Sequence, residues 1–319
     1  MIKPLVSVCI PCFNAEKYLF ETINCLISQD YENLEILIVD DNSTDSSFQI
    51  IEKLALKFDK IRYKKSVRKG AAAARNQAYD LSSGDFIIFF DADDLVEPKF
   101  ISSQLQTLNF NIEDCVISSW GRFTKTKETF LLDSTSVCRD LSFYEWIIYY
   151  WSNTSNMTIP GRILIPRNVV DKSGGWDENL SLNDDFQFFT NIFSQVKTIK
   201  YNNEGRLFYR SNIDGLSTKT LSYESQLSNF KSINQASDIA LSKFNDIKVK
   251  QACVNLFQKF IFDIYPKHAS LQRSAKQKID SIGLTPSIKF VSGGFTKILS
   301  SVIGWKATKK IKYLIKGRY

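Results

Sequence analysis

Three carboxylates within four positions are the strongest chemical signal in this sequence. Asp91, Asp93 and Asp94 follow directly on the apolar run Phe86 to Phe90. Like charges this close repel one another and raise each other's pKa, and a bound cation relieves the repulsion. Carboxylate oxygens suit a hard cation such as Mg²⁺ or Mn²⁺. The stretch therefore predicts either a metal site or a solvated acidic turn that caps the next helix, and it does not by itself decide between them.

The elements that position these carboxylates are short buried strands alternating with helices. Phe86 to Phe90 predicts a strand buried on both faces, since a half-buried strand would alternate polar and apolar residues. Leu5 to Ile10 and Leu34 to Val39 read in the same way, and helical periodicity lies between the strands. This order predicts a parallel sheet with right-handed crossovers. Its carboxyl edge, which is the usual ligand site of such sheets, would carry the loops after Pro11, Asp40 and Asp91.

That edge lacks the two usual phosphate-binding devices. No G-x-G-x-x-G follows the first strand, and no G-x-x-x-x-G-K-[ST] occurs in the sequence. Neither a dinucleotide dehydrogenase nor a P-loop NTPase is therefore favoured. A fold that binds phosphate without a glycine cradle needs another counter-charge, and a metal held by carboxylates would supply one.

A second pair of carboxylates lies far downstream. Asp184 and Asp185 precede a helix that bears Phe186, Phe189 and Phe193. In the first turn of a helix the dipole stabilises negative charge, so the pair is ordinary in structural terms. An ionised Asp at this place could also accept a proton from a hydroxyl group.

Bulk composition narrows the class of protein. The chain has 319 residues, a net charge of +7 and a pI near 8.9, which suits an anionic partner such as a nucleotide, a phospholipid surface or a nucleic acid. The single histidine, His268, argues against a Ser-His-Asp triad or a His-rich zinc site. Six scattered cysteines predict reduced thiols in a cytoplasmic protein. The first residues do not resemble a secretory signal, and no apolar stretch reaches the roughly 18 residues that span a bilayer.

The last third of the chain changes character. From about Tyr223 onward the sequence predicts helices, and Lys306 to Tyr319 alternates basic with apolar residues. A basic amphipathic end predicts a helix that rests on an anionic membrane face, here the inner face of the cell membrane. The alternative is a helical appendix packed on the core with a solvated basic tail. Nucleic-acid binding is disfavoured, because positive charge concentrates in this tail without a recognised module.

Taken together, the motifs resemble one known family. They are Val6 to Asn14, Val39 to Asp45, Gly70 with Ala74-Arg75-Asn76, Gly84-Asp85 leading to Asp91-Ala92-Asp93-Asp94, Gly175-Trp176-Asp177-Glu178, Asp184-Asp185 and Tyr209-Arg210. In this order and spacing they resemble the family 2 glycosyltransferases of GT-A fold over roughly the first 215 residues.

The resemblance implies an α/β fold, with a mostly parallel central sheet flanked by helices and a helical C-terminal appendix. It divides the chain into a glycosyltransferase domain, 1–220, and a helical region with the basic tail, 221–319. Within the first, residues 1–108 would form the nucleotide-binding half and residues 109–220 the acceptor-binding half.

The resemblance also assigns roles on the donor side. The loop Pro11 to Asn14, which includes Phe13, and the carboxylate of Asp41 would hold the base and ribose of a nucleotide-sugar, usually a uridine one. Arg75 would lie near the nucleotide or its sugar. Asp91-Ala92-Asp93 matches the D-x-D signature, with Asp93 binding Mn²⁺ or Mg²⁺ and Asp91 near the ribose or sugar.

On the acceptor side, Asp185 matches the second position of the family's Glu-Asp pair and would be the catalytic base. The first position is Asp184 here, which keeps the charge. Tyr209-Arg210 and the loop after it resemble a lid that closes over the diphosphate.

The implied function is inverting transfer of a sugar from a nucleotide-sugar donor to a saccharide or lipid-linked acceptor in surface polysaccharide synthesis. A catalytically inactive GT-A nucleotide-binding or membrane-scaffold protein is one alternative, and the presence of Asp93 and Asp185 argues against it. A nucleotidyltransferase is another. It should carry a glycine-rich, basic signature near its first strand, and Ile10 to Asn14 contains no Gly, Lys or Arg.

Overall fold

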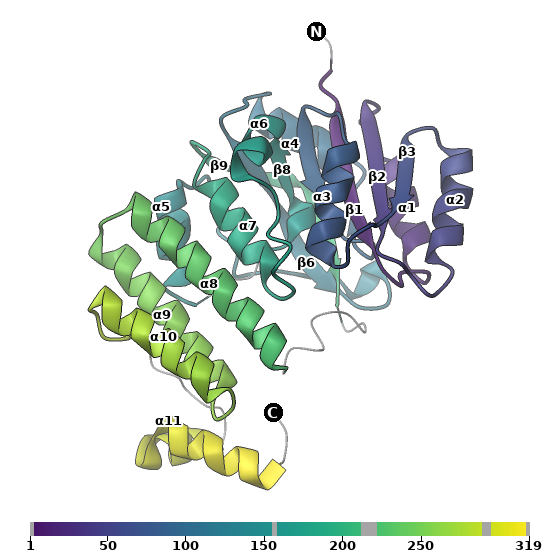
Figure 1. Ribbon diagram of the computed structural model, residues 1–319. Coiled ribbons are helices and arrows are strands. Elements are labelled where there is room, and N and C mark those ends of the chain that lie inside the picture. The colour runs from purple at the N-terminus through teal and green to yellow at the C-terminus, as the bar shows by residue number, and fades with distance from the viewer. Residues whose placement is uncertain (1–2, 155–157, 212–221, 289–294, 317–319) are drawn as a thin grey trace. The chain divides into compact units, whose positions relative to one another are not determined.

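The computed structural model describes residues 3–154, 158–211, 222–288 and 295–316 (Figure 1). The chain divides into two compact units. The first consists of Met1–Phe143 and Met157–Gly215, and the second of Tyr144–Asn156 and Leu216–Tyr319. The sequence places residues 144–156 with the first domain, whereas in the structure they group with the C-terminal helices.

The first half of the first unit is a parallel sheet. Its strands are β1 (Val6–Cys12), β2 (Leu34–Asp40), β3 (Ile61–Lys65) and β4 (Phe86–Phe89), in the order β3-β2-β1-β4. Every residue of β1, β2 and β4 except Pro11 is buried, which confirms the prediction from their mostly apolar sequences. Cys12 pairs with Asp40 and Cys9 with Phe89, so these strands end at one edge.

Strand β1 continues two residues beyond the predicted end at Ile10 and therefore includes Pro11. Proline is tolerated where the ladder needs no N–H donor. The carbonyl of Cys9 accepts from the N–H of Phe90, and Pro11, two residues on, faces the same side of the strand. The pairing of β4 with β1 stops at Cys9, so the missing N–H of Pro11 costs no strand-to-strand bond.

Helices cover both faces of this parallel sheet. They are α1 (Leu19–Ile27), α2 (Ser47–Lys57), α3 (Ala71–Leu81) and α4 (Phe100–Leu108). One core joins α1, α2 and α4 to alternate strand residues such as Ile36 and Ile88. On the other face α3 packs on β1 and β2, and Phe89 contacts the rings of Tyr79 and Phe188. Figure 1 shows α3 in front of these strands.

The second half continues the same sheet with mixed strand directions. Its strands are β5 (Leu95–Val96), β6 (Cys115–Phe123), β7 (Leu131–Leu132), β8 (Ile163–Pro166) and β9 (Ile199–Arg210), its α-helices are α6 (Arg167–Ser173) and α7 (Asp184–Phe193), and its short 3₁₀ turns are Lys127–Thr129 and Pro160–Arg162. From β4 the order runs β8-β6-β9-β5, with β7 paired to β6. Strand β8 is antiparallel to both β4 and β6, whereas β9 is parallel to β6.

Strand β9 lies inside the sheet and contains an irregularity. It is one strand between β6 and β5, with a register shift in which Ser118 pairs with Asn202 and Ser119 with Arg206. Gly205 has a φ of 120°, in the region that glycine adopts most readily, and the polar irregularity reads in sequence as a break.

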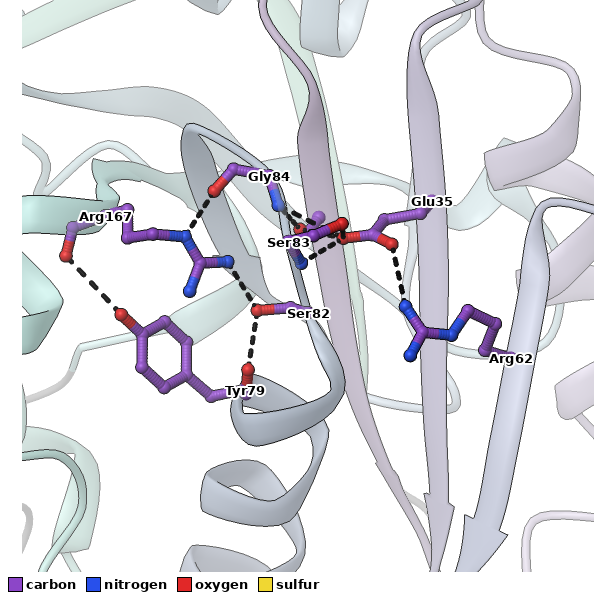
Figure 2. Close-up of polar contacts among 8 residues, drawn as sticks. Glu35, Arg62, Tyr79, Ser82, Ser83, Gly84 and Arg167 are labelled. Carbon is purple, nitrogen blue, oxygen red and sulfur yellow. Dashed lines mark hydrogen bonds and ion pairs between the residues drawn. The ribbon is translucent and has the colours of Figure 1, made fainter.

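A buried carboxylate organises the opposite, amino-terminal edge of the sheet (Figure 2). Oε1 of Glu35 accepts hydrogen bonds from the Ser7 hydroxyl at 2.6 Å and from the N–H groups of Ser83 and Gly84 at 2.6 and 3.1 Å. Its other oxygen, Oε2, lies 3.4 Å from Arg62. Burial acts to raise the pKa of Glu35, but these hydrogen bonds outweigh it and the pKa is lowered.

Gly84 completes this node, because no side chain fits there. A Cβ at Gly84 would lie 2.4 Å from the Ser7 hydroxyl and 2.8 Å from the backbone of Leu5. Arg167, at the start of α6, donates to the Gly84 carbonyl and to the Ser82 hydroxyl, so the node also anchors the second half of the unit (Figure 2).

The second unit is helical. Its elements are α8 (Tyr223–Lys243), α9 (Ile247–Ile264), α10 (Ala269–Ile282), α11 (Phe295–Lys316), most of α5 (Phe143–Trp146) and a π-helical turn, Ile147–Trp151. Asp246 caps α9 by accepting from the N–H groups of Lys248 and Val249, as an N-cap carboxylate should. Helix α9 is the centre of this unit and packs on α8, α10 and the π-helical turn. Helix α11 is interrupted at Gly304, whose φ is 76°.

Within the described ranges, no helix combines the length and apolar character that crossing a membrane requires.

Candidate active site

Two loops at the carboxyl edge of β1 and β2 are tied together. The N–H of Asn14 donates to the Ser43 hydroxyl at 2.9 Å, and the side-chain oxygen of Asn14 accepts from the N–H of Thr44 at 2.8 Å. The N–H of Asp41 donates to the Cys12 carbonyl at 2.7 Å. Asn14 adopts a left-handed backbone, which Asn tolerates better than most residues. The ring of Phe13 is 57% exposed, so this loop presents an aromatic surface to solvent.

Asp41 connects these loops to the start of α3. One of its oxygens, Oδ2, accepts from the N–H of Gly70 at 2.9 Å, while Oδ1 is buried without a hydrogen-bond partner among the described residues. Burial raises the pKa of Asp41, and the Gly70 N–H opposes that rise. Gly70 has a φ of 108°, which favours glycine at this junction.

The acidic turn after β4 is partly buried and holds three carboxylates close together. Burial first, and then the charge of Asp91, raise the pKa of Asp93 to about 7. Asp94 is fully buried, and its pKa is also raised by burial and by Asp93. Ala92, between Asp91 and Asp93 in the chain, is buried as well. The Oδ1 of Asp94 accepts a hydrogen bond from the backbone N–H of Arg210 at 2.9 Å, so Asp94 ties this turn to the end of β9.

Arg210 holds this turn from the end of β9. Its side chain is only 4% exposed, donates to the Asp93 carbonyl at 2.8 Å and pairs with Glu21 of α1 at 2.7 Å. Its guanidinium also lies over the rings of Tyr18 and Phe123. Glu21 carries no motif signal, and only the fold brings it to Arg210. The lid predicted after Arg210 falls on residues 212–221, outside the described residues.

Arg75 of α3 joins the two sets of carboxylates. Its guanidinium donates to Asp91 at 2.9 Å and to Asp184 at 3.0 Å, across 109 residues of sequence in the second case. Arg75 is buried, and although burial acts to lower its pKa, the two carboxylates raise it. Asp91 and Asp184 thus share the guanidinium of Arg75, a contact that the sequence did not predict.

Asp185 lies in the first turn of α7, as the sequence predicts. Burial first, and then the neighbouring charge of Asp184, raise its pKa to about 8, whereas Arg75 and the N–H of Phe186 act to lower it. A carboxylate whose pKa lies near the working pH can take a proton from a hydroxyl group and release it again. Asp184 shares Arg75 with Asp91, and the charge of Asp91 also contributes to the raised pKa of Asp185, so the two sets of carboxylates interact.

The acidic turn fits a divalent cation that brings further ligands with it. Asp91 and Asp93 offer hard oxygen ligands, and the charge of Asp91 is among the causes that raise the pKa of Asp93, a repulsion that a bound cation would relieve. In the described part of the chain, however, no group of three or more His, Cys, Asp or Glu side chains is arranged to hold a metal. Magnesium sites often consist of one or two carboxylates completed by water and substrate phosphates, and that type matches this turn.

Comparison with known proteins places the chain. The model of the family described as "Glycosyl transferase family 2" matches residues 7–173, slightly more than half of the sequence. This chain belongs to glycosyl transferase family 2. The match includes the two loops, Arg75 and the acidic turn, but ends before Asp184 and Asp185.

Family 2 relatives are similar over limited stretches. Glycosyltransferase GlyG of Streptococcus pneumoniae is 32% identical over 130 residues, which cover 40% of this chain and 43% of GlyG. The chain thus spans less than half the length of this relative.

Solved structures extend the likeness to the fold of the whole chain. TarS 1-349 of S. aureus, in complex with UDP-GlcNAc, has a TM-score of 0.72 at 16% identity, over 99% of this chain and 93% of that one. Mannosyltransferase PcManGT of Pyrobaculum calidifontis, in complex with GDP-Man and Mn²⁺, has a TM-score of 0.59 at 15% identity, over 98% and 86%. The fold of this family 2 member is therefore GT-A with C-terminal helices, as predicted.

Proposed function

We propose that this family 2 member is an inverting, metal-dependent glycosyltransferase. It would move a sugar from a nucleotide-diphosphate donor to a hydroxyl group of a saccharide or lipid-linked acceptor, in surface polysaccharide or glycolipid synthesis. The observation that carries the proposal is the pairing of Arg75 with both Asp91 and Asp184. It brings the carboxylates suited to a donor diphosphate next to a carboxylate suited to deprotonating an acceptor.

Asp185 is the proposed catalytic base. Its carboxylate takes the proton of the acceptor hydroxyl as that oxygen attacks the anomeric carbon. The new carbon–oxygen bond forms on one face of the sugar while the bond to the diphosphate breaks on the other. One displacement of this kind inverts the anomeric configuration and requires no histidine.

Asp93 is the proposed metal residue, with Asp91 beside it. The cation, Mn²⁺ or Mg²⁺, would supply positive charge where negative charge builds on the leaving diphosphate. The repulsion between the charges of Asp91 and Asp93 supports this assignment, because a bound cation would relieve it. The Mn²⁺ in the PcManGT complex lends it support from a protein of the same fold.

The proposed nucleotide site consists of the two tied loops and the start of α3. Phe13 offers an exposed ring for the base, and the Asp41 oxygen that lacks a partner is an acceptor for the base or ribose. Pro11, Asn14 and Ala92 shape the backbone of this site, and Arg75 lies beside the sugar. Arg210 acts on the donor by fixing the turn that carries Asp93, since its side chain is already paired.

The donor is proposed to be a UDP-sugar, in line with the UDP-GlcNAc of TarS. Thermal unfolding with a panel of nucleotide-sugars, with and without Mn²⁺, tests this directly. The expected result is stabilisation by one UDP-sugar that depends on Mn²⁺. Transfer or hydrolysis of the labelled donor then separates an enzyme from an inactive scaffold: metal-dependent binding with no turnover on any acceptor would favour the scaffold.

We also propose that the protein is cytoplasmic and binds peripherally to an anionic membrane surface, on which helix α11 rests. One side of α11 packs within its unit, where Trp305 lies 5.2 Å from the ring of Phe262. The side chains of Val302, Leu314 and Ile315 are more than 70% exposed. Exposed apolar residues interleaved with lysines favour a surface that is apolar inside and anionic outside.

Vesicle sedimentation tests the membrane proposal. Wild type should sediment with vesicles of anionic phospholipid at low salt and remain in solution with neutral ones. The double variant Leu314→Ser, Ile315→Ser should lose most of this binding, whereas Leu56→Ser, which changes an equally exposed leucine on α2, should not. Equal sedimentation of both variants would contradict the proposal.

A further inference from the structure

Asn76 clasps a loop from the other half of the first unit. Its side-chain oxygen accepts from the N–H of Trp176 at 2.9 Å, and its amide nitrogen donates to the Trp176 carbonyl at 2.9 Å. The same nitrogen lies 2.9 Å from the carboxylate of Glu178. One side chain thus fixes both backbone polar groups of Trp176, as a paired strand would.

The clasp leaves little room for other residues. Gly175 has a φ of 83°, and a Cβ there would lie 3.0 Å from the Asn76 oxygen. Arg68, before α3, forms an ion pair with Glu178 at 3.2 Å and adds a second tie between the same segments. The loop that carries Trp176 is therefore held against the N-terminal half of α3.

The clasped tryptophan covers the residue next to Asn76 in sequence. The indole of Trp176 lies 4.4 Å from the guanidinium of Arg75, in cation–π geometry. The ring of Phe188 on α7 stacks with this indole at 4.1 Å with an interplanar angle of 11°, and Phe89 of β4 meets it edge-on at 5.3 Å. Trp176 is 3% exposed, so its ring has no freedom to follow a moving arginine.

Arg75 needs such a support. Its side chain is long, and its Nε is buried without a hydrogen-bond partner among the described residues. Two carboxylates, Asp91 and Asp184, pull on its terminal nitrogens from separate elements. If the guanidinium could swing, it would pair with one carboxylate and abandon the other.

We propose that Asn76 and Trp176 are positioning residues, which hold the guanidinium of Arg75 midway between Asp91 on the donor side and Asp184 beside the base. Neither residue needs to contact a substrate for this role. The inference rests on the proposed glycosyl transfer for its effect on rate, but the arrangement of Arg75 can be measured without turnover.

The variant Trp176→Leu removes the aromatic face and keeps an apolar side chain, while Trp176→Phe retains a ring. We expect Trp176→Leu to lower kcat about 10-fold or more and Trp176→Phe to restore most of it, with both variants folded. The acid limb of kcat/KM should move to higher pH in Trp176→Leu. If Arg75 were free to move, its positive charge would offset less of the repulsion that Asp185 experiences from Asp184 and Asp91. The pKa of Asp185 would then rise.

Tyr79→Phe is the matched control. Tyr79 also lies on α3 and its hydroxyl bonds Asp171 of α6, so its removal loosens the same two halves without touching Arg75. This variant should keep both kcat and the pH limb of wild type.

Carboxyl ¹³C NMR of Asp185 in the nucleotide-free protein gives the readout that is independent of turnover. The pKa of Asp185 should be higher in Trp176→Leu than in wild type. Asn76→Ala should show the same rise, and it serves as the test variant if Trp176→Leu does not fold. If the pKa of Asp185 rises in the variants but the wild-type protein transfers no sugar, the proposed function is wrong and the positioning role is still supported. An unchanged titration together with kcat within twofold of wild type would overturn the positioning role.

Discussion

The two edges of the central sheet treat buried carboxylates in opposite ways. At the amino-terminal edge, Glu35 accepts hydrogen bonds from Ser7, Ser83 and Gly84, and these outweigh burial and lower its pKa. At the carboxyl edge, burial prevails and raises the pKa of Asp93 to about 7 and of Asp185 to about 8. All three residues are carboxylic acids, and the two edges differ in how many hydrogen-bond donors they offer to the carboxylate.

This difference separates a structural carboxylate from carboxylates available for chemistry. Glu35 meets its donors within the fold, so its charge stabilises the folded state. The carboxyl-edge aspartates lack enough donors, so folding has to tolerate their charges until a cation or a proton arrives. Substitution of Asp185 should therefore lower activity and raise stability, whereas substitution of Glu35 should lower stability and leave activity unchanged.

The largest effect is expected for Asp185→Asn. The amide cannot accept the acceptor's proton, and we expect kcat to fall about 10³-fold, with nucleotide binding largely intact. Kinetics of transfer and nucleotide titration measure the two properties separately. Turnover near the wild-type rate would show that Asp185 is not the base.

Asp93→Ala should abolish the part of donor affinity that depends on metal. We expect at least about a 10-fold loss of affinity with Mn²⁺ present, because the cation would lose its protein carboxylate. Isothermal titration of the nucleotide-sugar, with metal and with chelator, measures it. Affinity that is the same in wild type and variant under both conditions would remove the metal role from Asp93.

Glu35→Gln should cost stability and spare activity. Replacing a charged acceptor that faces several donors is expected to lower the free energy of unfolding by about 2–3 kcal/mol at pH 7. Because the folded pKa of Glu35 is lowered, this difference is present above about pH 4.5 and is lost as pH falls through the lowered pKa.

Chemical denaturation measures the effect of Glu35→Gln. The control Arg62→Ala removes only the exposed partner of Glu35 and should cost less than about 1 kcal/mol.

Asp185→Asn should instead stabilise the protein at pH 8, since the folded pKa of Asp185 is raised and its ionisation weakens the fold as pH rises from about 4 to 8. The same sign of change at both edges would refute the comparison.

The wild type needs no substitution to be tested, because its activity should depend on pH. The base must be deprotonated, so kcat/KM should rise with pH and level off above about 8, where Asp185 ionises in the free enzyme. Initial rates between pH 6 and 9 at saturating metal test this. A profile flat across that range would indicate that Asp185 is already ionised at pH 6.

Much of the fold follows from local sequence. The mostly apolar runs Val6–Cys12, Leu34–Asp40 and Phe86–Phe89 form buried parallel strands because only a strand covered on both faces hides such a run. The carboxylates after these strands then meet at one edge, because parallel strands with helical crossovers all point the same way. The first turn of α7 was equally legible, since Asp184 and Asp185 suit the helix dipole.

The tertiary structure alone decided which distant residues meet. No pattern in the sequence says that Arg75 pairs with Asp184, that Glu21 pairs with Arg210, or that Tyr144–Asn156 groups with the C-terminal helices. Local propensity sets where a strand or helix forms, but such contacts depend on how sheet order and helix packing place elements far apart in the chain. For the same reason the sequence could identify Asp93 and Glu35 as carboxylates, and only their surroundings in the fold set the direction of each pKa shift.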